Sequence, residues 1–276
     1  MRSNKINKIN FKSKRKASLP KWIKFSVFIL PFAVIVIIWA ELSGVVTLRK
    51  TEDMTGSKNA VSILWAGNSD IFVGELPEQL KTVAGSYGVE IIYRDISRHS
   101  NRGGSLSGLK EGAFKEIQNG KFDYVVLLDD PWHVMDNTEE FINEVRVYCA
   151  EAREHGVVPV LFNAAWALAN QRPDEEQLDL TTAAYKRAAE ENDAVFVNAA
   201  GAWIYAYQKM PDISLITKFD PRGPHPSKAG GFFTACLFAA VLFDLHIEDI
   251  PKESRYKGNN AIDLAEAAWE FARSSK

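Results

Sequence analysis

The sequence predicts an α/β fold in which one parallel sheet carries helices on both of its faces. Short apolar segments rich in β-branched residues alternate along most of the chain with longer segments of helical periodicity. That alternation is typical of parallel strands joined by crossover helices. The chain has 276 residues, which suits one medium-sized domain and an additional N-terminal segment.

The N-terminal segment predicts a membrane anchor. Residues 1–24 hold nine of the 33 Lys and Arg residues and no acid, and we interpret them as a basic cytoplasmic tail. Residues 22–48 are long and apolar enough to cross a lipid bilayer as a transmembrane anchor or signal-anchor. Two alternatives stay open. One is a cleaved signal peptide, and the other is a basic block that binds nucleic acid, although no basic stripe continues into the folded part.

The distribution of charged residues predicts that the remainder of the chain lies outside the cytoplasm. The net charge of −2 hides an asymmetry, because the chain without its basic tail carries a net charge of about −11. Since basic segments remain in the cytoplasm, we expect a single-pass protein whose acidic C-terminal domain is extracytoplasmic. Residues 49–59 are polar and lack apolar periodicity, so we expect a linker there, followed by the domain at 60–276.

Strands and helices are expected to alternate through this domain. The strand candidates are short and bounded by Gly or charged residues; they are 60–66, 89–95, 122–129, 157–163 and 194–198. The helix candidates have apolar residues at helical spacing; they are 76–87, 105–119, 137–155, 176–192, 199–209, 227–244 and 260–273. Right-handed crossovers would bring the carboxyl ends of all strands to one edge of the sheet, where open α/β sheets bind ligands.

Gly67-Asn68-Ser69 directly follows the first strand and is therefore expected at that edge. Serine suits nucleophilic catalysis where a base can reach it, and His225, in a rigid Pro-His-Pro loop, is the candidate base. Each residue alone has a plainer interpretation, Ser69 as part of an ordinary turn and His225 as a structural loop histidine. Gly103-Gly104 could offer backbone N–H groups to an anion, or could be a simple turn.

Together and in this order, these segments resemble the SGNH hydrolase superfamily, in a variant with Gly-Asn-Ser where most members have Gly-Asp-Ser. The resemblance covers about residues 60–245 and rests on four short motifs; they are Ile63-Leu64-Trp65-Ala66-Gly67-Asn68-Ser69, Gly103-Gly104-Ser105-Leu106, Phe122-Asp123-Tyr124-Val125-Val126-Leu127-Leu128 and Gly223-Pro224-His225-Pro226-Ser227-Lys228-Ala229-Gly230. It implies a flavodoxin-like three-layer sandwich around a five-stranded parallel sheet. It also implies activity on esters, often acetyl groups of carbohydrates or lipids.

The resemblance further implies roles for individual residues. Ser69 would be the nucleophile and His225 the base. Asp220 could orient the histidine, or the pair could work as a dyad without an acid. The oxyanion hole would use the backbone N–H groups of Ser69 and Gly104, with Gly103 as the neighbouring choice.

Two positions depart from the family pattern. Where the family has a side-chain amide after the third strand, this chain has Leu128-Asp129-Asp130, and a carboxylate there would oppose the developing oxyanion. We expect Asn163, after the fourth strand, or Asn101 to supply the missing amide. The family's acid lies three residues before the histidine. Arg222 occupies that position here, whereas Asp220 lies five residues before it.

Three further residues at the edge are predicted to contact the substrate. Trp132 could line a pocket that stacks on a sugar ring, or could simply cover the core. Asn68 and Asp129 complete the predicted set. No metal-ligand spacing is found, and no cofactor is expected. The two cysteines, Cys149 and Cys236, are expected to be separate buried thiols, with a disulfide as the alternative in an exported domain.

Two functions fit the sequence. The first is a membrane-anchored, extracytoplasmic SGNH-like serine esterase or O-acyltransferase that acts on acyl esters, above all acetyl esters, of a carbohydrate or envelope polymer. Its partners would be a small-molecule or glycan ester and, for transfer, an envelope protein that brings the acyl donor. The second is a binding or scaffold module of an envelope assembly that keeps the fold without the chemistry. The missing amide after the third strand and Arg222 in the position of the family's acid favour this second function. A nucleotide-binding domain is a weaker idea, because no G-x-G-x-x-G follows the first strand.

Overall fold

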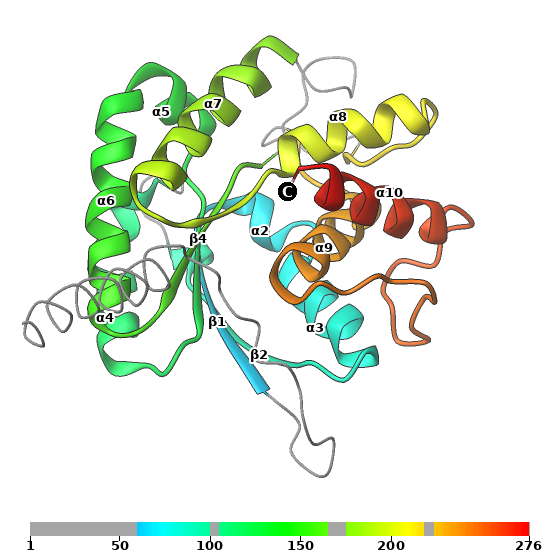
Figure 1. The fold of residues 1–276 in the computed structure, drawn as a ribbon, viewed down its shortest axis with the longest axis horizontal. Coiled ribbons are helices and arrows are strands. Elements are labelled where there is room, and N and C mark those ends of the chain that lie inside the picture. The colour runs from blue at the N-terminus through cyan, green and yellow to red at the C-terminus, as the bar shows by residue number, and fades with distance from the viewer. Residues whose placement is uncertain (1–59, 100–104, 165–174, 218–223, 276) are drawn as a thin grey trace, which may run out of the picture. The chain divides into compact units, whose positions relative to one another are not determined.

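A five-stranded parallel sheet forms the centre of the domain in the computed structural model (Figure 1). The structure describes residues 60–99, 105–164, 175–217 and 224–275, so the predicted tail, anchor and linker at 1–59 lie outside it. The strands run in the order β2-β1-β3-β4-β5, and every neighbouring pair is parallel. The predicted α/β class with a five-stranded parallel sheet is confirmed.

The central strands are covered on both faces, as their continuous apolar sequences predict. The strands are β1 (Ala60–Ala66), β2 (Glu90–Asp95), β3 (Tyr124–Leu127), β4 (Val158–Phe162) and β5 (Val195–Val197). β1 lies between β2 and β3, with Trp65 in register with Asp95 on one side and Val126 on the other. The last four residues of β1 are completely buried, so the chain leaves the core only at the turn that follows.

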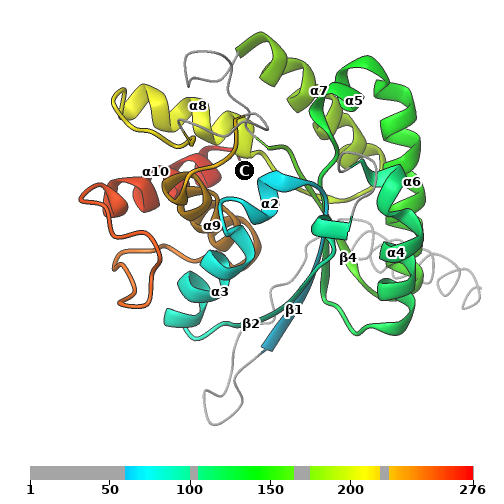
Figure 2. The same ribbon diagram turned by 180° about the vertical axis from the view of Figure 1, so that it is seen from behind.

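Two layers of helices enclose the sheet, and they complete a three-layer sandwich (Figure 1, and from behind in Figure 2). One layer holds α4 (Leu106–Asn119), α5 (Pro131–Asp136), α6 (Thr138–Glu154) and α7 (Glu175–Glu191). The other holds α3 (Leu76–Ser86), α8 (Ala199–Lys209), α9 (Lys228–Phe243) and α10 (Ala261–Ser274). α2 (Ser69–Phe72) is a single turn after β1, and the short 3₁₀ helix η1 (Ser97–His99) follows β2.

α9 is the most apolar of these helices and lies in the core, with nearly all of its residues buried. Phe238 packs against Trp65 of β1, with ring centroids 5.2 Å apart, and against Phe162 of β4 at 5.3 Å. Such aromatic pairs add to the stability that burial alone provides. Cys236 on this helix and Cys149 on α6 are both buried and unpaired, which confirms the prediction of two separate thiols.

The predicted helices all occur, with ends that differ by at most one residue, and the strand ends differ by at most two. α2, α5 and η1 were not predicted, because each is shorter than two helical turns and so has no apolar periodicity. Among the residues that the structure describes, none of the helices combines the length and the apolar character needed to cross a membrane.

Candidate active site

A tight turn after β1 places Ser69 at the carboxyl edge of the sheet. A Cβ atom at Gly67 would lie 2.7 Å from Ile71 Cδ1 and 2.8 Å from Leu128 Cβ, so only glycine fits this close approach to the core. The chain then enters α2 at Ser69. The first N–H groups of a helix have no acceptor within it, so the Ser69 N–H lies where an anion can be bound.

Asn68 fixes the start of α2. Its side-chain oxygen accepts a hydrogen bond from the Asp70 N–H at 2.9 Å and so caps the helix. Its amide nitrogen lies 3.5 Å from the backbone oxygen of Asp129, to which it donates. The side chain is buried and used on both of its polar ends. This geometry makes Asn68 a residue that positions Ser69, and its contact with a substrate stays a prediction.

A short antiparallel pairing positions His225 just before α9. Ile216 and Pro226 form a β-bridge, and the backbone oxygen of His225 accepts a hydrogen bond from the Thr217 N–H at 2.9 Å. The side chain of Ser227 then caps α9 by accepting from the Gly230 N–H. The histidine is therefore held on both sides by backbone contacts.

Two glycines let the start of α9 approach the turn after α2. A Cβ atom at Gly231 would lie 1.9 Å from the backbone oxygen of Gly74, so no larger residue fits without a shift of the backbone. The amide of Gln79 joins the same two segments, because it donates to the backbone oxygens of Gly74 at 2.8 Å and Lys228 at 3.0 Å. These contacts hold the His225 segment against the Ser69 segment.

Ser69 Oγ and His225 Nε2 lie 2.8 Å apart, although the two residues are separated by 156 positions in the sequence. An imidazole with an unprotonated Nε2 at this distance can take the hydroxyl proton as the oxygen attacks a carbonyl carbon. His225 is 7% exposed, whereas Ser69 is half-buried, so the imidazole is shielded while the hydroxyl keeps some exposed surface. The arrangement can perform acyl transfer of the Ser-His type. Asp220, the predicted acid, lies outside the described residues.

The predicted oxyanion donors have different outcomes. Gly104, with its neighbour Gly103, lies outside the described residues. Asn163 is buried, and its amide nitrogen donates to Thr182 Oγ1 at 2.9 Å and to Asn198 Oδ1 at 3.1 Å. Both amide hydrogens thus have acceptors inside the fold, and a role of Asn163 in the oxyanion hole stays a prediction. The side chain links β4 to α7 and to the start of α8.

Asp129, which follows β3, points into the protein. Its side chain has no exposed surface, and Oδ1 accepts hydrogen bonds from the N–H groups of Leu106 at 3.3 Å and Asp130 at 2.6 Å. Oδ2 lies 3.0 Å from His133 Nδ1. Burial raises the pKa of Asp129, although the hydrogen bond and charge of His133 act against this rise. The side chain of Asp129 thus faces the core, and its contact with a substrate stays a prediction.

Asp70 is a second buried carboxyl group and directly follows Ser69. Burial, and then the negative charge of Asp130, raises the pKa of Asp70 from its ordinary value of 3.8 to about 7. The side chain is 7% exposed. The charge beside the candidate nucleophile therefore changes around neutral pH.

Trp132 lies in the first turn of α5, at the same edge. Asp130 caps this helix by accepting hydrogen bonds from the N–H groups of Trp132 at 3.0 Å and His133 at 3.3 Å. Trp132 is 53% exposed, as stacking on a ligand requires. The structure is therefore compatible with the predicted substrate contact of Trp132.

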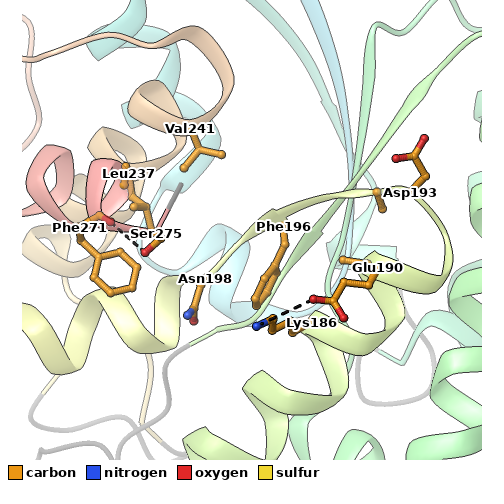
Figure 3. Close-up of a pocket in the computed structure, with 12 residues that line it drawn as sticks. Lys186, Glu190, Asp193, Phe196, Asn198, Leu237, Val241, Phe271 and Ser275 are labelled. Atoms are coloured by element: carbon orange, nitrogen blue, oxygen red, sulfur yellow. Dashed lines mark hydrogen bonds and ion pairs between the residues drawn. The ribbon is translucent and has the colours of Figure 1, made fainter. Parts of the chain in front are cut away.

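A pocket of about 570 Å³ is lined by α7, β5, α9 and α10 (Figure 3). Phe196 and Leu237 contribute apolar surface, and Lys186 forms an ion pair with Glu190 beside them. Neither Ser69 nor His225 lines this pocket, so we do not assign it to ester chemistry.

Solved structures share the fold of this domain. A DUF4886 family protein from Bacteroides uniformis superposes with a TM-score of 0.60 at 14% sequence identity, over 77% of this chain and 94% of that one. A proposed SGNH hydrolase from Slackia heliotrinireducens superposes with a TM-score of 0.50 at 19% sequence identity, over 67% of this chain and 100% of that one. The chain has the fold of the SGNH hydrolases.

A third structure with the SGNH-like fold is the acetyl xylan esterase AlAXEase, with a TM-score of 0.50 at 15% identity, over 63% of this chain and 96% of that one. No protein-family model matches the chain, and no curated protein matches it. Identities this low establish the fold alone. The roles of residues in this SGNH fold therefore rest on the geometry described above.

Three side chains near the end of β3 were not singled out as site residues by the sequence. His133 follows Asp129 by four positions, a spacing that could have indicated the pair. Tyr185 Oη accepts a hydrogen bond from the Asp129 N–H at 2.7 Å, and Glu144 lies near both Asp129 and His133. Tyr185 and Glu144 come from α7 and α6, so only the packing of these helices brings them to β3.

Proposed function

We propose that this protein is a serine ester hydrolase of the SGNH type, in which Ser69 is the nucleophile and His225 the general base. The observation that carries the proposal is the distance of 2.8 Å between Ser69 Oγ and His225 Nε2. Both groups lie at the carboxyl edge of the sheet, where folds of this class bind ligands. The likeness of the fold to an acetyl xylan esterase supports ester chemistry.

The proposed reaction has two halves. Ser69 Oγ attacks the carbonyl carbon while His225 Nε2 takes the hydroxyl proton, and the N–H of Ser69 stabilises the oxyanion. The leaving alcohol takes the proton back from His225, and an acyl-enzyme remains on Ser69. Water then attacks the acyl-enzyme by the same steps and releases the acid. Gly104 as a second oxyanion donor and Asp220 as the orienting acid are parts of this proposal.

An acetyl ester of a carbohydrate or envelope polymer is the substrate class that we propose. The exposed indole of Trp132 offers an apolar surface on which a sugar ring can stack. Transfer would replace hydrolysis if a sugar hydroxyl, rather than water, reached the acyl-enzyme. An envelope protein that supplies the acyl donor would then be a partner.

Chemical labelling of the full-length chain in non-ionic detergent tests the proposal. We expect a fluorophosphonate probe to label the protein and 4-nitrophenyl acetate to be hydrolysed. Ser69→Ala should abolish the labelling and lower turnover by about 10³-fold or more. Ser86→Ala, at the distant C-terminal end of α3, is the matched control and should leave both unchanged.

Absence of labelling and of turnover in a folded wild-type protein would overturn the esterase proposal. It would favour the second candidate, a glycan- or protein-binding module without chemistry. The end of β3 is the observation that favours this candidate, because the carboxyl groups of Asp129 and Asp130 stand there in place of an amide donor. Binding of an acetylated glycan that Ser69→Ala leaves intact would then support the module.

Membrane anchoring through residues 22–48, with the domain outside the cytoplasm, is also part of the proposal. It is supported by the apolar run and by the basic residues that precede it. The full-length chain should stay with membranes after an alkaline carbonate wash, and a chain without residues 1–48 should not. Recovery of the full-length chain in the wash would contradict the anchor.

A further inference from the structure

Three potential metal ligands from three separate elements converge next to the candidate active site. Asp129 follows β3, His133 lies on α5 and Glu144 lies on α6. Each offers one ligand atom, and these atoms all lie within 4.8 Å of one another. The sequence predicts no metal site, because the spacing of these residues matches no short ligand motif.

The Asp129 carboxylate is held rigidly. Its Oδ1 accepts from the N–H groups of Leu106 and Asp130, and its backbone N–H donates to Tyr185 Oη at 2.7 Å. These contacts turn Oδ2 towards His133 Nδ1, which lies 3.0 Å away. A preorganised ligand oxygen of this kind reduces the ordering that a metal ion would otherwise have to impose.

Glu144 gives a second reason, besides the convergence of the three ligands, to expect a cation here. Its Oε2 atom is sealed from solvent and has no hydrogen-bond partner. Lys110 also acts on Glu144 electrostatically, yet no ion pair between them is found in the part of the chain that the structure describes. Glu144 as a whole is half-buried, but a carboxylate oxygen shielded in this way without a donor is costly, and a bound cation would relieve that cost.

The donor set and its charge fit a divalent transition metal. One imidazole and two carboxylates carry a charge of −2 when the imidazole is neutral, which a divalent ion balances. In a tetrahedral Zn²⁺ site with bonds of about 2.0–2.2 Å, neighbouring ligand atoms lie about 3.3–3.5 Å apart. The contact of 3.0 Å between Asp129 and His133 is near this separation, and the long side chain of Glu144 can close the remaining gap. Mg²⁺ and Ca²⁺ prefer oxygen ligands alone.

We propose that Asp129, His133 and Glu144 form a binding site for one divalent transition-metal ion of the Zn²⁺ type. The ion would tie the carboxyl end of β3 to α5 and α6. Since the backbone oxygen of Asp129 accepts from Asn68, the ion would also brace the turn that carries Ser69. The role is structural and includes no chemical step on the ester. The competing explanation is a charged His133 that bridges the two carboxylates without a metal.

Direct metal binding distinguishes these explanations. The full-length protein, without a histidine tag, is freed of metal with EDTA, transferred to detergent buffer and titrated with Zn²⁺ in a calorimeter. We expect about one equivalent to bind. Zn²⁺ at about 100 times its Kd should raise the melting temperature by about 5 °C or more. If the metal-free wild-type protein shows no saturable binding of Zn²⁺, the proposal is overturned.

Variants assign the site. His133→Asn and Glu144→Gln should each weaken Zn²⁺ binding about tenfold or more. His155→Asn is the matched control, because His155 also faces a glutamate of α6, Glu151, at 3.7 Å, and no third ligand joins this pair among the described residues. Binding that His133→Asn and Glu144→Gln leave intact would overturn the proposal. If these variants do not fold, Co²⁺ bound to the wild-type protein decides. Strong visible absorption bands of tetrahedral Co²⁺ support the site, and their absence overturns it.

Discussion

Two histidines face the carboxyl edge of the sheet, and each has a different partner. His225 Nε2 lies 2.8 Å from the hydroxyl of Ser69, and His133 Nδ1 lies 3.0 Å from the carboxylate of Asp129. Burial alone would lower the pKa of His133, but the hydrogen bond and charge of Asp129 outweigh it, so the pKa is raised. Ser69 gives His225 a hydroxyl proton to take during attack on an ester, whereas the Asp129 carboxylate offers His133 no hydroxyl to activate. The presence of a nucleophile beside the imidazole therefore separates the candidate base from the structural histidine.

The largest expected effect comes from exchanging each histidine for glutamine. His225→Gln removes the proposed base, so turnover of 4-nitrophenyl acetate should fall about 10³-fold or more, while the unfolding midpoint changes little. His133→Gln should instead lower the free energy of unfolding by about 1–3 kcal/mol, because the buried Asp129 carboxylate loses its partner. Steady-state kinetics and chemical unfolding of both variants make the comparison. Equal losses of activity in the two variants would remove the distinction between these histidines.

The buried carboxyl group of Asp70, next to Ser69, should make the stability of the protein depend on pH. Because folding raises the pKa of its carboxyl group from 3.8 to about 7, the folded state keeps a proton that the unfolded state releases. The carboxyl group therefore reduces stability as the pH rises from about 4 to about 7, and the loss is complete above the folded pKa. At about 1.4 kcal/mol for each pH unit, Asp70→Asn should stabilise the protein by at most about 4 kcal/mol at pH 8.

Chemical unfolding at pH 4 and pH 8 measures this effect. At pH 4 Asp70→Asn and the wild type should differ by less than about 1 kcal/mol, since the carboxyl group is then neutral in the folded state and only about half ionised in the unfolded state. Asp249→Asn, a substitution of an exposed carboxyl in the loop before α10, controls for the exchange itself. A stability gain that is the same at both pH values would show that the effect comes from packing and not from charge.

Gly231 tests how the fold brings Ser69 and His225 together. Alanine there would place a Cβ atom 1.9 Å from the backbone oxygen of Gly74, so α9 must move away from the turn after α2. We expect Gly231→Ala to cost about 1–3 kcal/mol of stability and to reduce ester turnover, whereas His133 should keep its contacts. Thermal unfolding and kinetics measure both.

The control is Gly112→Ala on α4, where an added Cβ atom meets nothing within 4 Å. That substitution should raise stability by about 0.5–1 kcal/mol, because alanine favours a helix more than glycine does. A Gly231→Ala protein with full activity would mean that the approach of α9 to this turn does not position His225.

The fold was predictable because its elements are long or strongly apolar. The segments of β1 and α9 have continuous apolar sequences, and each helix of three or more turns shows its periodicity. α2 and α5 were missed because a helix of four or six residues is set by its caps, Asn68 and Asp130, and not by a repeating apolar pattern.

The candidate site was predictable only where its chemistry is local in the sequence. Ser69 and His225 each lie in a short motif, and the fold brings them together. The surroundings of Asn163 and Asp129 were not predictable, because their partners come from other helices. The amide of Asn163 is taken by Thr182 of α7 and by Asn198, and the Asp129 carboxylate by His133 and the N–H of Leu106. A residue at the right edge can thus face inward for reasons that only packing shows.

Trp132 offers the smallest expected effect, and it contrasts an exposed residue of the α5 turn with an inward-facing neighbour. Trp132 is 53% exposed, and the next residue, His133, turns towards Asp129. If the indole stacks on a sugar, Trp132→Ala should raise KM for an acetylated sugar about three- to tenfold with little change in kcat, because the contact is equal in substrate and transition state. KM for 4-nitrophenyl acetate, which has no sugar ring, should change less. A fall in kcat and melting temperature without a KM difference between the two esters would show that Trp132 covers the core instead.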